Sequence, residues 1–293
     1  MSMNPIDVLS IKEFEPHDMS SAFYSSNIPD HITNHKNAIS KPHKHDFYLT
    51  VLFTKGFGTH EIDFKVYDIV PGSLFLLRPG QLHNWKLTDD IDGFIFFHSD
   101  DFYELEYVNR NMQGFPFFYS SQNPSILNLD KNHTKRISTV FNSINQEFIN
   151  NDLYRKQKVI SLLDLLYIEL SRLYMASNEV EVFKSSSYTS KLWDLEKLIN
   201  KHFKQEKSPT AYAHMLHITP KHLNRIVKAT LNKTSMDLIT DRVILEAKRM
   251  LVHSSDTFSN IASNLGYEDY AYFSRVFKHK TGSTPSAFKN DYL

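Results

Sequence analysis

The first hundred residues alternate apolar and polar positions in the manner typical of β-strands. In the run Glu61–Val66, Ile62, Phe64 and Val66 recur at every second position and are expected on one face of a strand. Short apolar runs follow one another, separated by Gly-Phe-Gly and Pro-Gly turn signals. Several short strands at such spacing predict a small β-barrel or sandwich. The predicted strands are Phe47–Thr54, Thr59–Tyr67, Leu74–Leu77 and Gly93–His98.

After Leu129 the apolar positions take a helical period, which predicts helices over Asn132–Asn150 and Leu153–Met175. The second helix carries one continuous apolar stripe at three- and four-residue steps. Two interpretations of this stripe remain open. It is either buried against the barrel of the same chain or packed against the same helices of a second chain, as a dimer seam. The stripe consists of Val159, Leu162, Leu166, Leu170 and Leu173.

Periodicity lapses from Ser177 to Ser190, where a run of three serines indicates a flexible connection. From Lys191 onward the pattern is helical throughout. The expected fold class is therefore α+β multidomain, with a β-barrel followed by an all-α domain. We divide the chain into a barrel over residues 1–130, a helical pair for dimerisation over 131–176, a linker over 177–190 and a helical domain over 191–293.

The helical domain contains an internal repeat, which appears when the sequence is compared with itself. At an offset of 49 residues Ala213 falls on Ala262, and at an offset of 50 Arg225 falls on Arg275. The sequence pattern of each copy predicts a short helix, a tight turn and a second helix, which is a helix-turn-helix layout. The predicted helices are Thr210–Leu216 and Pro220–Leu231 in the first copy, and Phe258–Leu265 and Asp269–Lys280 in the second.

The turns and the connection between the two copies can also be predicted. Gly266 accepts a positive φ at no steric cost, and His217, in the first turn, is a residue type that tolerates it moderately well. Ser235–His253 has apolar positions at helical steps and no internal Gly or Pro, so it should be one helix. At a rise of 1.5 Å per residue this helix is about 28 Å long, close to the ~34 Å of one DNA turn.

Charge is distributed unevenly along the chain, although its net value is zero. Residues 188–293 hold 16 Lys and Arg against 10 Asp and Glu, a net charge of +6. Residues 1–187 hold 17 against 23, a net charge of −6. Such a split is typical of a nucleic-acid-binding part attached to an acidic partner domain, and solvated surface faces can produce the same bias.

Composition removes several kinds of chemistry. The 293 residues include no cysteine, so disulfides, thiolate nucleophiles and Cys-ligated metals are excluded. The N-terminus shows no secretory signal, and charged residues interrupt the most apolar segment, Val159–Leu173, which is too short to span a bilayer. We therefore expect a cytoplasmic protein without a membrane partner.

The second helix of each copy is expected to present polar residues outward, since Leu223 and Val227, like Phe273 and Phe277, point inward. Arginine reads guanine bidentately, asparagine reads adenine, and lysine or serine suits phosphates and base edges. Two arginines at matching repeat positions in the basic part of the chain favour double-stranded DNA as the partner. The outward residues are Lys221, Asn224, Arg225 and Lys228 in the first copy, and Tyr270, Ala271, Ser274, Arg275 and Lys278 in the second.

A dense series of residues leads from Ile261-Ala262 through Gly266-Tyr267-Glu268-Asp269 and Phe273-Ser274-Arg275 to Thr281-Gly282-Ser283-Thr284-Pro285. This series resembles the C-terminal signature of the AraC/XylS family of bacterial transcription regulators, and the resemblance extends back to about Leu192. It implies two helix-turn-helix units joined by a long helix, with base contacts from the second helix of each unit. The positions it implies are Lys221, Asn224, Arg225, Tyr270, Ala271, Tyr272, Ser274 and Arg275.

Three histidines of the N-terminal part are candidates for a common site. His43 and His45 lie two residues apart on a predicted strand and His83 follows a turn on another, so the three imidazoles are expected to converge. The surrounding segments are similar to the cupin-like barrel that many members of this family use to sense an effector and to dimerise. Metal-binding cupins usually add a carboxylate where this chain has Leu49 and Thr50. We therefore expect an effector-contacting or structural role for these histidines, with no metal and no cofactor.

Two functional hypotheses follow, from different classes. The first is a sequence-specific, dimeric transcription regulator without enzymatic activity, whose barrel binds a small-molecule effector, with RNA polymerase left open as a further partner. The alternative is a cupin-type metal enzyme with an accessory DNA-binding domain, which the missing carboxylate disfavours. In a further interpretation, the barrel only dimerises and DNA binding is constitutive.

Overall fold

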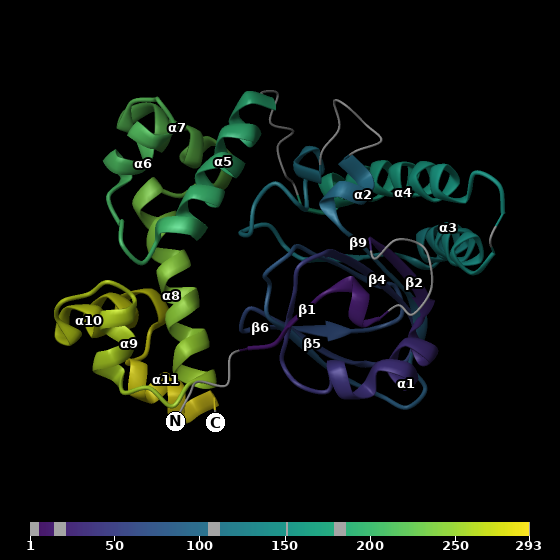
Figure 1. Ribbon diagram of the computed structural model, residues 1–293, viewed down its shortest axis with the longest axis horizontal. Helices are drawn as coiled ribbons and strands as arrows, with labels where there is room; N and C mark the ends of the chain where they lie inside the picture. Colours follow the sequence, from purple (N-terminus) through teal and green to yellow (C-terminus); the bar gives the residue numbers. More distant parts are fainter. Residues whose placement is uncertain (1–5, 15–21, 105–111, 151, 179–185, 293) are drawn as a thin grey trace. The chain divides into compact units, whose positions relative to one another are not determined.

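The computed structural model describes residues 6–14, 22–104, 112–150, 152–178 and 186–292 (Figure 1). Packing divides the chain near residue 182 into an N-terminal and a C-terminal unit. Residues 179–185, in the middle of the expected linker, lie outside the described residues, and the linker's last residues already belong to helix α5 (Ser186–His202). The four-part domain division stays a prediction. No helix of the described ranges combines the length and apolar character needed to cross a membrane.

The N-terminal unit is β-rich, as the sequence predicts, and the strands of its described residues form three hydrogen-bonded sheets. The largest is antiparallel, with the order β10-β7-β4-β9-β2, and the second has the order β6-β5-β8. A short parallel pair joins β1 to β3. The strands are β1 (Val8–Leu9), β2 (Phe23–Asn27), β3 (Lys44–His45), β4 (Tyr48–Lys55), β5 (Gly58–Ile62), β6 (Lys65–Ile69), β7 (Ser73–Leu77), β8 (His83–Leu87), β9 (Asp92–His98) and β10 (Ile126–Asn128).

The single strand expected over Thr59–Tyr67 is wrong, because the chain reverses in its middle. Asp63 and Phe64 both take positive φ, at 48° and 66°, and form the tight turn between β5 and β6. Consecutive residues with positive φ are typical of the two-residue turns that match the twist of a hairpin. Ile62 is consequently buried while Val66 is 64% exposed, so these residues do not share one face.

The large sheet buries both faces, because alternate residues of its strands enter two different cores. In β9, Ile95 and Phe97 belong to the core that includes residues of both sheets, whereas Phe96 belongs to the core with helices α3 (Lys131–Ile149) and α4 (Arg155–Asn178). The remaining helical segments of the described ranges include two α-helices that the sequence pattern did not predict, and the side chain of Asn27 caps the first of them, α1. They are α1 (Ile28–Ile39), α2 (Asp100–Glu104) and the 3₁₀ turns Ile11–Glu13 and Met112–Gly114.

The apolar stripe of α4 lies inside the core of its own chain. Val159, Leu166 and Leu170 are fully buried there, and Leu162 and Leu173 are half-buried against the same core. The dimer-seam interpretation is therefore wrong for the three buried side chains, because packing against the sheet leaves none of their surface for a second chain. The first of the two interpretations, burial within the monomer, holds for them.

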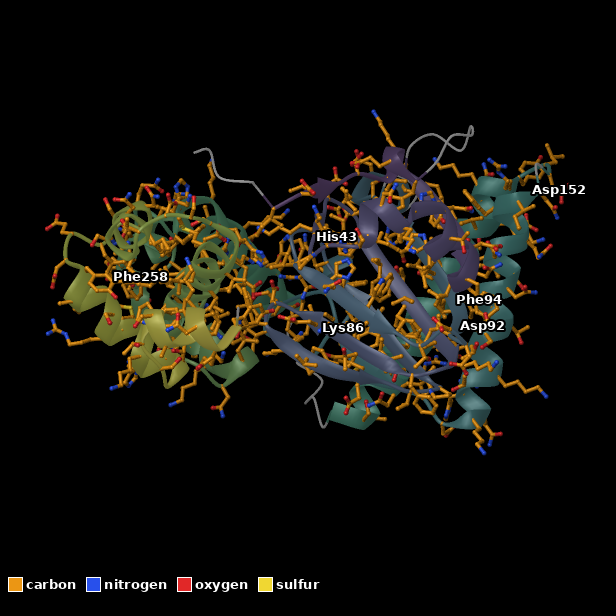
Figure 2. The ribbon with its side chains drawn as sticks, turned by 90° about the horizontal axis from the view of Figure 1, so that it is seen from below. His43, Lys86, Asp92, Phe94, Asp152 and Phe258 are labelled. Atoms are coloured by element: carbon orange, nitrogen blue, oxygen red, sulfur yellow. The ribbon has the colours of Figure 1, made fainter. Side chains whose placement is uncertain are left out.

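The described part of the C-terminal unit is helical throughout, and α8 covers the residues expected for the connecting helix. In Figure 1, α8 runs between the pair α6 and α7 and the pair α9 and α10. Phe258, labelled in Figure 2, begins α9. The helices after α5 are α6 (Pro209–Met215), α7 (Pro220–Leu231), α8 (Ser235–His253), α9 (Phe258–Asn264), α10 (Tyr270–Thr281) and α11 (Pro285–Tyr292).

The two copies of the repeat end their second helices with equivalent caps. The side chains of Thr219 and Asp269 accept hydrogen bonds from the first turns of α7 and α10. Asn232 and Gly282 terminate these helices in the left-handed conformation, with φ of 53° and 83°. Each pair is separated by 50 residues, the offset of the sequence repeat.

Candidate nucleic-acid interface and effector site

The first helix-turn-helix unit, α6 and α7, has the inward side predicted from the sequence. Leu223 and Val227 of α7 are fully buried, with Ala213 of α6. His217 lies in the turn with a φ of 55°, which confirms that this position uses the left-handed region. The opposite side of α7 is thereby directed to solvent.

The outward side of α7 carries three exposed cations, Lys221, Arg225 and Lys228. Arg225 Nη2 lies 3.0 Å from Nδ1 of His222, one helical turn away. These residues, with others of the same helix, line a surface hollow of about 750 Å³. The face therefore presents long cationic side chains of the kind that contact phosphates and guanine edges.

Asn224 is placed differently from the expectation that it reads a base. Its side-chain oxygen accepts a hydrogen bond of 3.0 Å from the backbone N–H of Ser235, at the start of α8. A bidentate contact to adenine needs both the oxygen and the amide NH₂ of asparagine. In this conformation Asn224 joins α7 to α8 and has only its NH₂ group to offer to DNA.

The second unit, α9 and α10, exposes a comparable face. Ala271, Tyr272, Arg275 and Lys278 are exposed, and the guanidinium carbon of Arg275 lies 6.0 Å from the ring centre of Tyr272. The other two predicted residues of this face are half-buried. They are Ser274 and Tyr270, and the ring of Tyr270 stacks on Phe258 at 6.3 Å.

The turn of the second unit packs closely on the loop that precedes the first unit. Gly266 has a φ of 76°, as expected, and Lys207 donates hydrogen bonds of 3.0 Å to its carbonyl oxygen and 3.2 Å to that of Lys204. The Lys207 ammonium also lies 4.9 Å from the ring centre of Tyr267. Burial lowers the pKa of Lys207. This lysine therefore links the two helix-turn-helix units, in addition to the connection that α8 makes.

One cation of α10 has a structural partner rather than a free charge. Lys280 donates to Asp237 at 2.7 Å and lies 3.0 Å from Asp241, both on α8. Hydrogen bonds from Lys280 and Thr234 hold the pKa of Asp237 at about 2. Lys280 therefore fixes α10 on α8 and is not counted among the candidate DNA contacts.

The N-terminal unit brings together the three histidines singled out in the sequence, of which His43 is labelled in Figure 2. His43, His45 and His83 are buried, and the His83 ring centre lies 4.4 Å from that of His43 and 5.1 Å from that of His45. His60 was missed, yet its Nε2 lies 3.0 Å from Nδ1 of His83. The signal for His60 was its place two residues before Ile62, on the inward side of β5.

Burial governs the protonation of this histidine cluster (His43, His45, His60 and His83). Desolvation lowers the pKa of His45 and of His60 to about 3, and that of His83 well below its usual value. The cluster is therefore neutral at pH 7. Three of its buried nitrogens, His45 Nε2, His60 Nδ1 and His83 Nε2, have no hydrogen-bond partner in the described part of the chain. Within the same ranges, no set of three or more His, Asp or Glu side chains is arranged to hold a metal ion.

Comparison with known families covers both units. The AraC-like ligand binding domain matches residues 30–97, which include the whole histidine cluster, and a helix-turn-helix domain matches residues 212–291. The chain belongs to the AraC family of transcription regulators. As an AraC-family protein it combines a small-molecule-binding N-terminal domain with a DNA-binding C-terminal domain, which confirms the resemblance and the DNA-binding, effector-controlled regulator of the first functional hypothesis.

Two transcriptional activators are similar in sequence to most of this AraC-family chain. The HTH-type transcriptional activator RhaS of Escherichia fergusonii is 22% identical over 244 residues, which is 83% of this chain and 85% of the relative. RhaS of Escherichia coli O81 is 24% identical over 245 residues, with the same two shares.

Among solved structures the chain matches ToxT from Vibrio cholerae, with a TM-score of 0.41 and 15% identity over 92% of this chain and 98% of ToxT. The C-terminal domain of AraT from Geobacillus stearothermophilus is 26% identical, with a TM-score of 0.35, over 37% of this chain and 90% of that domain.

Proposed function

We propose that this protein is a transcription activator that reads DNA with the outward faces of α7 and α10. The observation that carries the assignment is the exposure of Arg225 and Arg275 at equivalent positions of the two units. Lys221 and Lys228 flank the first arginine, and Lys278 follows the second, as phosphate contacts. The RhaS relatives are named activators, which supports the direction of regulation and RNA polymerase as a further partner.

We propose that one chain reads two short boxes on one face of DNA. The length of α8, about 28 Å for its 19 residues, is close to the ~34 Å between successive major grooves on one face. Lys207 and Lys280 add contacts that hold the two helix-turn-helix units in a fixed relation to each other. The two boxes are then about ten base pairs apart.

Replacement of either arginine is expected to affect only one box. Arg225→Ala and Arg275→Ala should each cost about 1–3 kcal/mol of binding free energy and relax base preference in one box only. Lys278→Ala is the control, because loss of a phosphate contact weakens binding to all sequences alike and lowers the salt slope by about 1. Binding-site selection with the full chain measures the preference, and relaxation of the same box by both arginine variants would contradict the bipartite arrangement.

We propose that the effector contacts the histidine cluster. The partnerless nitrogens of His45, His60 and His83 can bond polar groups of a small molecule, whereas the incomplete ligand set disfavours the metal-enzyme alternative. The protein then has a regulatory ligand and no turnover. Thermal unfolding of the purified chain across a panel of small molecules tests this, because a ligand of the folded unit raises Tm.

We propose that the chain acts as a homodimer through the exposed side of α4. Leu165 is 51% exposed on that side, whereas its neighbour Leu166 is fully buried. Leu165→Glu is expected to shift the sedimenting species toward the monomer with Tm nearly unchanged. Leu166→Glu is the matched comparison, and it should lower Tm strongly, since it buries an unpaired charge. If Leu165→Glu sediments as the parent chain does, the exposed side of α4 is not the dimer interface.

A further inference from the structure

Each candidate reading arginine follows an aromatic ring on its own helix by three residues. His222 precedes Arg225 on α7, and Tyr272 precedes Arg275 on α10. The two rings are 50 residues apart, so they occupy equivalent positions of the repeat. Residues three apart on a helix face each other, and in both units the ring contacts the guanidinium.

The two contacts differ in chemistry. On α7 the guanidinium Nη2 of Arg225 donates to the ring nitrogen Nδ1 of His222 at 3.0 Å. On α10 the guanidinium carbon of Arg275 lies 6.0 Å from the centre of the Tyr272 ring, a cation–π contact that needs no acceptor atom. The first contact depends on the nitrogen atom of the ring, and the second on the π-face.

A tyrosine from outside the helix packs against each of the two rings, His222 and Tyr272. The ring centres of Tyr188, on α5, and His222 are 6.0 Å apart, and those of Tyr267, in the turn before α10, and Tyr272 are 5.9 Å apart. Tyr267 in turn lies beneath the ammonium of Lys207. Both rings therefore have contacts that restrict them before DNA arrives.

This arrangement has a direct effect on base recognition. A free surface arginine loses rotamer entropy when it is held in one geometry. A contact that already restricts the guanidinium reduces this loss and favours the alignment that a bidentate guanine contact requires. Phosphate contacts tolerate many alignments, so the benefit falls on discrimination between bases rather than on total affinity.

We propose that His222 and Tyr272 are positioning residues that orient Arg225 and Arg275 for base recognition, the first as a hydrogen-bond acceptor and the second through its ring face. This inference rests on the proposed function, because it requires both arginines to read bases. The two rings then set specificity through the arginines, and Tyr272, which the family resemblance places among the base contacts, acts on the base through Arg275.

The test places the same side chain at the two equivalent positions. His222→Phe keeps a ring against Tyr188 and removes the acceptor, so discrimination at the base pair read by Arg225 should fall about two- to tenfold. Tyr272→Phe keeps the ring face and should retain discrimination at the base pair read by Arg275. Tyr272→Leu removes the face and should reduce that discrimination about two- to fivefold, whereas His222→Gln restores an acceptor and should recover most of the first effect.

The measurement uses the full chain, duplexes selected by that chain from a randomised pool, and single-base variants of those duplexes. Discrimination is the affinity ratio of matched to variant duplex, and the salt slope and Tm are recorded for every protein. Under the proposal the ratios change while slope and Tm stay near those of the parent. Equal effects of the two Phe substitutions, or unchanged ratios in His222→Phe and Tyr272→Leu, would overturn it.

The same data separate this inference from the proposed function. If Arg225→Ala and Arg275→Ala relax discrimination but the aromatic variants do not, only the positioning role is lost. If the two alanine variants leave discrimination intact, the arginines do not read bases, and the proposed reading faces fail together with the positioning role.

Discussion

Acidification from pH 7 to about 5.5 is expected to lower the stability of the N-terminal unit strongly. Burial lowers the pKa of His31, His45 and His60 to about 3 and that of His98 to about 4, and it lowers the pKa of His83 strongly. In the unfolded chain these imidazoles bind protons below about pH 6.5. The unfolded state therefore holds more protons in this window, so stability falls as the pH falls.

The size of this effect is comparable to the stability of a whole domain. One pH unit below 6.5, five such histidines together remove about 5–7 kcal/mol, and domains are commonly stable by 5–15 kcal/mol. The chain has two tryptophans, Trp85 in the N-terminal unit and Trp193 in the C-terminal unit. Urea titrations of Trp193→Phe at several pH values follow Trp85 alone. An unfolding free energy that stays constant between pH 7 and 5 would contradict the neutral, buried histidines.

Gly266→Ala is expected to destabilise the C-terminal unit by about 3 kcal/mol or more. A left-handed φ costs a residue with a Cβ roughly 1–2 kcal/mol. At this position the added Cβ would also stand 1.9 Å from the carbonyl oxygen of Lys204, so the loop that carries Lys207 must move. Loss of that contact should in addition weaken binding to the box read by α10.

Gly282 provides the matched control in the same unit. Its φ of 83° is similar to that of Gly266, but a Cβ there meets no atom within 4 Å. Gly282→Ala should therefore cost only the backbone term, about 1–2 kcal/mol. Urea unfolding followed by Trp193 compares the two variants. Equal losses would show that the contact with Lys204 contributes nothing.

Features set by local sequence could be predicted, and those set by tertiary contacts could not. The helix Ser235–His253 and the left-handed residues His217 and Gly266 follow from nearby periodicity and steric rules, and they are confirmed. The turn at Asp63 and Phe64 was missed because alternation continued through it, as apolar residues stand on both sides of the reversal.

Two aspects of the site depend on residues distant in sequence. Asn224 bonds Ser235, eleven residues away, which no outward-facing pattern on α7 indicates. The histidine cluster includes His60 because β5 and β8 pair, with Ile62 opposite His83. The inward position of His60 could have been inferred from the strand alternation, but its partner could not, because strand order is not readable from one strand alone.

The equivalent caps of α7 and α10 give the two proposed reading helices the same length and the same end geometry. Each spans 12 residues between a capping side chain at its start and a left-handed residue at its end. Their inward residues differ in size, Leu223 and Val227 against Phe273 and Phe277, so only the outward positions can be transplanted without repacking. A chimera that carries the outward residues of α10 on both helices should prefer a direct repeat of a single box. The domain can then serve as a scaffold for proteins that bind designed DNA sites.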